Sequence, residues 1–313
     1  MSSVIESIQK RSFTITVKRS LPEKVLTPEN QPDFYQMLIV EPGSQVTIAS
    51  IDPDCLSSCQ SYETAAVFGS YVRKIDHLQY VMHAEKKHSL LIILQGLDAG
   101  GKDGAVRHIL TSLNPAGCRV AAFKQPTKAE LAHDFLWRVH PHAPARGEVA
   151  IFNRSHYEDV LVARVHRLVP PDIWSQRFGL INEFERLLAV ANETVILKFF
   201  LHISKEEQLA RFKRRLEDPG RRWKISEADY QEREHWDEYM AAFEDVLRKT
   251  STRHAPWFII PANDKCLRDM AISQIIVRTL EELNMQLPET EVDIARIRRR
   301  YHAAEAEGRS EVS

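Results

Sequence analysis

The stretch LLIILQGLDAGGKDGAVRHIL, residues 90–110, constrains the fold more than any other part of this chain. It places the pattern G-x-x-x-x-G-K, from Gly96 to Lys102, between an apolar run and a helical pattern. Glycines let backbone N–H groups turn inward on a phosphate, the following helix adds its N-terminal dipole, and the lysine adds a positive charge. The sequence therefore predicts a phosphate-binding loop between a strand and a helix. The alternative is a glycine-rich turn with a solvated lysine.

Two aspartates distinguish this loop from the usual pattern. Asp103 directly follows the lysine, where such loops usually carry Ser or Thr to hold magnesium. Asp98 lies inside the loop, where a carboxylate repels a phosphate unless a cation lies between them. We therefore expect Asp98 to bind Mg²⁺, directly or through water, or to orient the attacking oxygen. The simplest expectation for Asp103 is a first-turn acid that is favourable to the helix dipole.

Five apolar runs alternate with helical patterns over the middle of the chain. Near-continuous apolar runs suit strands buried on both faces, and the intervening helices suit a parallel sheet covered on both sides. The sequence thus predicts an α/β fold, a three-layer αβα sandwich with a central parallel sheet. The expected strands are LLIILQ (90–95), CRVAAFK (118–124), EVAIFN (148–153), TVILKFFLHI (194–203) and WFIIPA (257–262).

Three segments are expected along the chain. Residues 1–60 form an N-terminal arm, in which FTITVK (13–18) alternates like a strand. Residues 61–287 form the main domain, which opens with a helix. Residues 288–313 form a charged tail that is expected to be a surface helix over 292–308.

Two capping patterns predict helix starts in the main domain. SKEE (204–207) is a capping box that starts a helix directly after the fourth strand. SEAD (226–229) is expected to cap a further helix. The apolar face of that helix is Trp236, Met240, Phe243 and Leu247.

Polar side chains follow the third predicted strand, in EVAIFNRSHYEDVL (148–161). This is the carboxyl edge of the sheet, beside the loop. Asn153 can bind a metal, or a metal-bound water, through its carbonyl, and Arg154 can clamp phosphate oxygens. We expect Glu158 or Asp159 to meet an acceptor or a second metal, with an exposed helix turn as the alternative.

The segment RFKRRLEDPGRRWK (211–224) carries seven basic residues against two acidic ones, and its Asp-Pro-Gly breaks it as a turn. Two basic arms around a turn suit a lid that closes over a highly charged phosphate ligand and excludes water. We expect this lid over about residues 208–250. A solvated helix face is the alternative. Lys124 ends the second strand, and Arg138 and Arg146 follow it. We expect these residues to line the same channel, with ordinary surface charge as the alternative.

Composition restricts the partners. The net charge is −1, so the chain has no general basic field for nucleic acid, and a polyanion site must be a local patch. No apolar run approaches the roughly 18 residues that would span a bilayer. The start MSSVIESIQKRSF lacks an apolar signal region, and the four cysteines suit reduced thiols. These features favour a cytoplasmic protein that binds neither membrane nor nucleic acid.

Six motifs in order resemble the family-2 polyphosphate kinases, over roughly residues 50–287. The motifs are GLDAGGKDG (96–104), NPAGCRVAAFK (114–124), DFLWRVH (134–140), PARGEVAIFNRSHYEDVLVARVH (144–166), LKFFLHISKEEQLARFKRRLEDP (197–219) and WDEYMAAFEDVLRKTST (236–252). The resemblance implies a P-loop kinase-like fold with a helical lid. It also implies phosphoryl transfer between inorganic polyphosphate and AMP, ADP or ATP, with Mg²⁺ (or Mn²⁺), in a homo-oligomer, a dimer or tetramer.

The family positions map onto Asp98, Lys102 and Arg154, and onto lid arginines. Many members carry an acid where this chain has Asn153. The motif FNRSHYED resembles a branch with Asn at that position, which is associated with both mono- and diphosphate acceptors. The alternatives are an ATP-dependent nucleotide kinase and a non-catalytic polyphosphate- or nucleotide-binding module. The candidate residues are Asp98, Lys102, Arg154, Arg211 and Arg215 for catalysis; Gly96, Ala99, Gly100, Gly101, Asp103, Gly104, Lys124, Asn153, Glu158, Asp159, Arg214, Arg222 and Lys224 for phosphate or nucleotide binding; and Asp98 and Asn153 for the metal.

Overall fold

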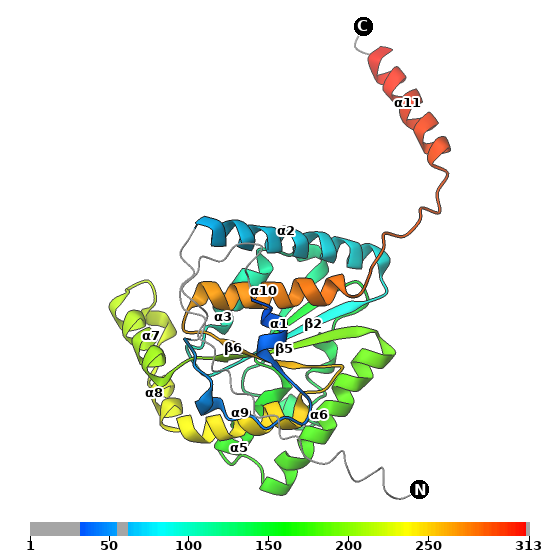
Figure 1. The fold of residues 1–313 in the computed structure, drawn as a ribbon. Helices are drawn as coiled ribbons and strands as arrows, with labels where there is room; N and C mark the ends of the chain where they lie inside the picture. The colour runs from blue at the N-terminus through cyan, green and yellow to red at the C-terminus, as the bar shows by residue number, and fades with distance from the viewer. Residues whose placement is uncertain (1–31, 55–61, 311–313) are drawn as a thin grey trace, which may run out of the picture.

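A computed structural model describes residues 32–54 and 62–310. At its centre lies a six-stranded sheet in the order β1-β6-β5-β2-β4-β3 (Figure 1). The five expected strands are confirmed, and they pair in parallel. A short strand from the N-terminal arm, which was not predicted, pairs antiparallel with β6. The strands are β1 Ile39–Val40, β2 Ser89–Gln95, β3 Cys118–Ala122, β4 Val149–Asn153, β5 Thr194–His202 and β6 Trp257–Pro261.

Helices cover both faces of the sheet, as the apolar runs predicted (Figure 1). Every residue of β2 is buried. Its alternate side chains enter two different cores, Leu90, Ile92 and Leu94 in one and Leu91 and Ile93 in the other. The first core includes α1 Phe34–Leu38, α2 Tyr62–Glu85, α3 Lys102–Leu110 and α10 Lys265–Glu281, and the second includes α5 Val162–Val165, α6 Pro171–Ala191 and α9 Trp236–Thr250.

The described part of the N-terminal arm is built into the fold. Phe34 is fully buried in the first core, and its backbone N–H donates to Oε1 of Gln274 on α10 at 2.7 Å. Asp33 pairs with Arg278 of the same helix at 2.7 Å. The arm therefore closes the edge of the sheet beside the C-terminal helix of the core. The expected strand at residues 13–18 lies outside the described residues.

The basic segment, residues 211–224, covers the second half of α7 Lys205–Glu217 and the turn that leads to α8 Glu227–Glu234, and both helices lie beside the carboxyl edge of the sheet (Figure 1). Ser204 caps α7 as predicted by accepting from the Glu207 N–H at 3.0 Å. The Glu207 carboxylate does not complete the expected box, because it accepts from Arg211 and Arg214 instead. Ser226 donates its N–H to Asp229 at 2.8 Å, which confirms the second cap.

The prediction of one helix running from the SEAD cap through the Trp236–Leu247 face is wrong. The chain breaks at His235 into α8 and α9. The reason is packing: α8 has no buried residue, whereas α9 buries Trp236, Phe243 and Leu247 in the two cores. Part of the range expected for the lid, about 208–250, is therefore a core helix.

The tail forms the expected charged helix, α11 Ile294–Ser310, which stands away from the body (Figure 1). Its described side chains, up to Ala306, are exposed. The remaining α-helix is α4 Lys128–Leu131, after β3. Among the described residues, none of the helices has the length and apolar character needed to cross a bilayer.

Candidate active site

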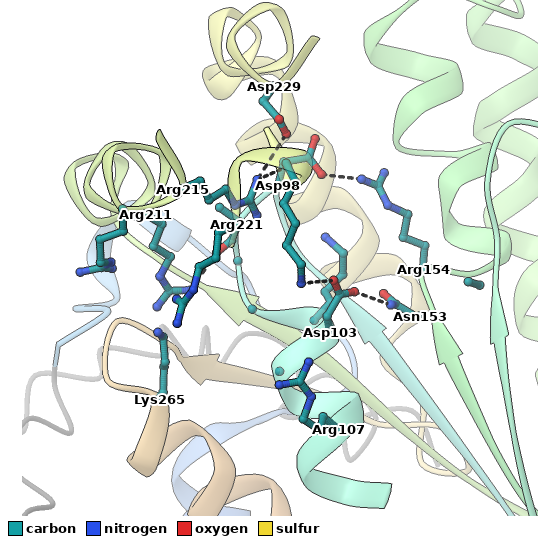
Figure 2. Close-up of a pocket in the computed structure, with 18 of the residues that line it drawn as sticks. Asp98, Asp103, Arg107, Asn153, Arg154, Arg211, Arg215, Arg221, Asp229 and Lys265 are labelled. Carbon is teal, nitrogen blue, oxygen red and sulfur yellow. Dashed lines mark hydrogen bonds and ion pairs between the residues drawn. The ribbon is translucent and has the colours of Figure 1, made fainter. Parts of the chain in front are cut away.

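A cavity of about 930 Å³ opens at the carboxyl edge of the sheet (Figure 2). The loop after β2, the ends of β3 and β4, the α7–α8 region and the start of α10 line it. Its charge is one-sided, because eleven basic side chains face three acidic ones. The basic residues are Lys102, Arg107, Lys124, Arg154, Arg211, Arg214, Arg215, Arg221, Lys224, Lys265 and Arg268, and the acidic ones are Asp98, Asp103 and Asp229.

The loop has the backbone that close approach to a phosphate requires. Gly101 has φ of +103°, which L side chains rarely adopt, and a Cβ there would collide with the Arg268 guanidinium. Ala99 has φ of +59°, a strained value for a residue with a side chain. Because α3 starts at Lys102, the helix N-terminus points into the cavity, as the sequence predicted.

Lys102 lies inside the loop. Its ammonium donates to the Gly96 carbonyl at 2.6 Å and to the Leu97 carbonyl at 3.1 Å. Burial, reinforced by the charge of Arg154, lowers the pKa of Lys102 to about 8, although Asp98 acts in the opposite direction. The ammonium is thus a charge that the surroundings stabilise only partly, and an anionic phosphate would stabilise it further.

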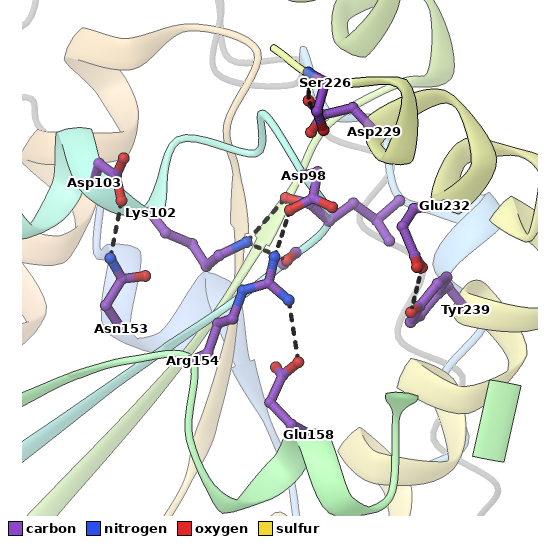
Figure 3. Close-up of polar contacts among 12 residues, drawn as sticks. Asp98, Lys102, Asp103, Asn153, Arg154, Glu158, Ser226, Asp229, Glu232 and Tyr239 are labelled. Carbon is purple, nitrogen blue, oxygen red and sulfur yellow. Dashed lines mark hydrogen bonds and ion pairs between the residues drawn. The ribbon is translucent and has the colours of Figure 1, made fainter. Parts of the chain in front are cut away.

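Arg154 joins the loop to the turn after β4 (Figure 3). Its guanidinium donates to Asp98 at 2.5 Å and to Glu158 at 3.1 Å. Its φ of +61° is strained, as is common at functional sites. The strand ends so that Arg154 faces the carboxylate inside the loop and the same cavity.

Asp103 lies in the first turn of α3, as expected, and it also contacts two side chains from other elements. It accepts from the Asn153 amide at 2.9 Å and lies 3.8 Å from the Lys224 ammonium (Figure 2). The Asn153 amide nitrogen is therefore engaged, and its carbonyl is the group that can face a cation. Asp103 links α3, the end of β4 and the lid segment.

The oxygen groups at this edge suit a magnesium ion that arrives with its substrate. No group of three or more His, Cys, Asp or Glu that could hold a metal occurs within residues 32–54 and 62–310. Mg²⁺ is commonly bound by one or two carboxylates together with substrate phosphates. Asp98, Asp103 and the Asn153 carbonyl fit that arrangement and do not fit a permanent metal cage.

The three arginines of α7 differ in their partners. Arg211 is buried and donates to Glu207 at 2.7 Å, to the Ala99 carbonyl at 2.8 Å and to the Ala262 carbonyl at 2.5 Å. Arg214 is half exposed and pairs with Glu207. Arg215 lies 3.7 Å from Asp229 and donates to the Lys224 carbonyl. Arg211 thus supports the loop backbone, and Arg214 lies closer to solvent.

Some candidates lie outside the cavity lining. Gly96 accepts from Lys102, and Glu158 pairs with Arg154. Arg222 donates to the Leu216 carbonyl. Asp159 lies 3.4 Å from Arg177 and 3.6 Å from Arg138, and burial raises the pKa of its carboxyl.

Of the two further basic residues considered, neither lines the cavity. Arg138 is buried and donates to the Lys124 carbonyl at 2.8 Å. Arg146 precedes β4, at the opposite edge of the sheet, where it approaches the Ala191 carbonyl at 3.5 Å. Lys124 itself does line the cavity, as expected.

Four basic residues of the lining are not among the predicted site residues: Arg107, Arg221, Lys265 and Arg268. Arg221 lies in the basic segment, where its neighbour Arg222 was the candidate. Arg107 lies one turn after Asp103 on α3, so i, i+4 spacing could have found it. Lys265 and Arg268 lie one turn apart at the start of α10, directly after the last strand. Their position just after the carboxyl end of that strand is the sequence feature that could have predicted them.

Comparison with known proteins decides the family. Residues 61–288 match the family described as Polyphosphate kinase 2. The chain belongs to the polyphosphate kinase 2 family. The resemblance drawn from its motifs is thereby confirmed.

Relatives in the polyphosphate kinase 2 family match most of the chain. An AMP/ADP-polyphosphate phosphotransferase of Meiothermus ruber is 48% identical over 80% of this chain and 95% of its own length. An ADP-polyphosphate phosphotransferase of Rhodopseudomonas palustris is 44% identical over 70% of this chain and 80% of its own. The crystal structure of polyphosphate kinase 2 from Arthrobacter aurescens superposes with a TM-score of 0.84 at 36% identity, covering 89% of this chain and all of that one.

Proposed function

We propose that this protein transfers a phosphoryl group between inorganic polyphosphate and nucleotides, converting AMP to ADP and ADP to ATP in a reversible, Mg²⁺-dependent reaction. The observation that carries the proposal is the cavity, in which eleven cations surround a phosphate-binding loop. A single nucleotide needs fewer cations, whereas polyphosphate carries about one negative charge per phosphate along its length. The names of the two relatives agree with this substrate class.

The cations fall into two groups, which suggests how the substrates divide the cavity. Arg221 and Lys265 lie on the side of α7 and α10, and Arg154 lies across the loop from them (Figure 2). Arg214 belongs to α7 and also lines the cavity. Burial lowers the pKa of Lys265, and the positive charges of Arg211, Arg214, Arg268 and Arg221 lower it further. So dense a set of like charges suits the polyphosphate chain, and the Arg154 side suits the nucleotide.

Transfer then proceeds in line at the loop. A terminal phosphate oxygen of the acceptor attacks the terminal phosphorus of polyphosphate, the bond to the next phosphate breaks, and the chain leaves one phosphate shorter. Lys102 and the loop N–H groups hold the phosphates at the transfer point, and Arg154 neutralises the equatorial oxygens. Mg²⁺ bound at Asp98 and Asn153 would supply positive charge there. An acceptor phosphate is already nucleophilic, so no strong general base is required.

Two features support AMP as well as ADP as the acceptor. Asn153 replaces the acid that many family members carry, and its amide is held by Asp103. The Meiothermus ruber relative is named for both acceptors. A homo-oligomer of two or four chains and a cytoplasmic location remain predictions that sedimentation and cell fractionation would test.

The decisive experiment follows phosphorus NMR of the purified protein with Mg²⁺ and long-chain polyphosphate, with AMP or ADP in separate tubes. We expect ADP and ATP to form from AMP, and ATP from ADP. Asp98→Ala and Lys102→Ala are inactive controls, which circular dichroism should show to be folded. Turnover of ADP alone would contradict the role of Asn153. Phosphorylation of AMP by ATP, without any use of polyphosphate, would show instead that the protein is an ATP-dependent nucleotide kinase.

A further inference from the structure

Two buried side chains of α7 hold the backbone of the phosphate loop from behind. Gln208 donates its amide Nε2 to the Asp98 carbonyl at 2.9 Å, and Arg211 donates to the Ala99 carbonyl at 2.8 Å. Gln208 is 2% exposed. Both carbonyls belong to the part of the loop that includes the strained Ala99. The two side chains of α7 therefore fix the orientation of the Asp98 and Ala99 carbonyl groups.

A second helix fixes the orientation of the Gln208 amide. Arg233 of α8 donates to Oε1 of Gln208 at 2.8 Å and to the Lys205 carbonyl at 2.8 Å. A guanidinium has donors and no acceptor, so the amide oxygen must face Arg233 and its N–H₂ must face Asp98. A continuous path of hydrogen bonds therefore runs from α8 through α7 to the loop residue that pairs with Arg154.

We propose that Gln208 is a positioning residue for phosphoryl transfer, oriented by Arg233, and that it sets the Asp98 peptide and so the direction of the Asp98 carboxylate. Gln208 lies outside the cavity lining and acts through Asp98. This inference rests on the proposed function, because its main test measures the rate of phosphoryl transfer.

The physical reason lies in the Asp98 carbonyl. Without its donor, this carbonyl either stays buried and unpaired or rotates toward the cavity. A carbonyl that faces the cavity opposes the phosphates with its negative end. A rotated peptide also displaces the carboxylate that contacts Arg154. Displacements of about 1 Å in a catalytic group can reduce a rate by about 10²-fold.

The sharpest test is Gln208→Glu, measured in the full-length protein. The substitution keeps the size of the side chain and an acceptor for Arg233, replaces the donor to the Asp98 carbonyl with a carboxylate oxygen, and adds one negative charge. We expect kcat to fall at least about tenfold, with the KM for polyphosphate within twofold of wild type and a circular dichroism spectrum like that of the wild-type protein. Gln231→Glu is the matched control, because it introduces the same charge at an exposed position of α8.

Hydrogen–deuterium exchange gives a measure that does not depend on turnover. We expect faster exchange in peptides covering residues 96–104 of Gln208→Glu, and no change in Gln231→Glu. A folded Gln208→Glu protein with wild-type kcat, or with a lower kcat and unchanged loop exchange, would overturn the proposal. If Gln208→Glu does not fold, the same two measurements on Arg233→Met test the proposal. This variant keeps the Gln208 amide that donates to Asp98 and removes the guanidinium that orients it.

The two hypotheses fail in different ways. Absence of polyphosphate turnover in the wild-type protein would remove the proposed function. Loop exchange would then still show whether Gln208 positions Asp98. Normal wild-type turnover with no effect of Gln208→Glu would remove only the positioning role.

Discussion

At Lys102, burial competes with the positive charge that a phosphate site requires. The side chain is 8% exposed, and its ammonium contacts two carbonyls of its own loop. Its pKa of about 8, against an ordinary value of 10.5, is the direct result. The charge of this group therefore changes within a pH range where the protein can be assayed.

As pH rises, loss of the Lys102 proton should lower the activity and raise the free energy of unfolding. Because kcat/KM reports the free enzyme, we expect it to fall as pH rises through about 8, when the lysine loses its proton. The unfolded chain binds more protons than the folded chain between about pH 8 and 10.5, so this group's contribution to stability grows with pH there. Rate profiles and urea denaturation over pH 7–10 measure both. A level kcat/KM up to pH 10 would contradict the role of this ammonium.

Asn153→Asp should make the protein's stability depend on magnesium. The new carboxylate would lie opposite Asp103, at the 2.9 Å contact that the amide now makes. Like charges at this distance destabilise the fold unless one is protonated or a cation lies between them. We expect a lower Tm in EDTA and a larger rise with Mg²⁺ than in wild type. Thermal denaturation measures this, and equal Mg²⁺ responses would contradict it.

The motifs predicted most of the residues that line the cavity, and the others became apparent only from the geometry. The loop and NRSHYED stand out because their spacing is fixed by local backbone needs. Gln208 and Arg268 do not, since their role depends on which helix lies behind the loop, and that is a matter of tertiary packing. No local pattern in the sequence carries that information.

At the scale of elements, burial decided where the predictions held. The five parallel strands are mostly apolar, and the sequence predicted each of them within a few residues of its observed ends. Strand β1 has two residues, which is too short for any alternation to be visible. The break at His235 was missed because a polar helix and an amphipathic one follow each other without a Gly or Pro between them.

Phe34→Ala tests whether the N-terminal arm is part of the core. Phe34 is fully buried against the first core, so its removal should lower the free energy of unfolding by about 3–5 kcal/mol. We expect kcat to stay within twofold, because the residue lies far from the cavity lining in sequence and contacts. Urea denaturation measures the loss of stability, and the rate of ATP formation from polyphosphate and ADP measures kcat. A stability loss below about 1 kcal/mol would mean that the arm is only loosely attached.

At the scale of the whole molecule, the tail is separate from the catalytic body. The family match ends at residue 288, and α11 begins at Ile294 with its described side chains exposed. Removing residues 289–313 should therefore leave Tm within about 2 °C and kcat unchanged, since little apolar surface loses its cover. Differential scanning calorimetry and the polyphosphate assay test this. A Tm loss of more than about 5 °C would show that α11 packs on the body or on another copy.

The contacts of α1 with α10 and of β1 with β6 join residues more than two hundred positions apart. During synthesis, the N-terminal arm must therefore wait until nearly the whole catalytic region has left the ribosome before it finds its partners. Lys265 and Arg268, which complete the cavity, emerge in the same late interval. A nascent chain that stops before them can form the loop and the first strands, yet it cannot have the full set of charges. The enzyme gains its site only in the last tenth or so of the catalytic region's translation.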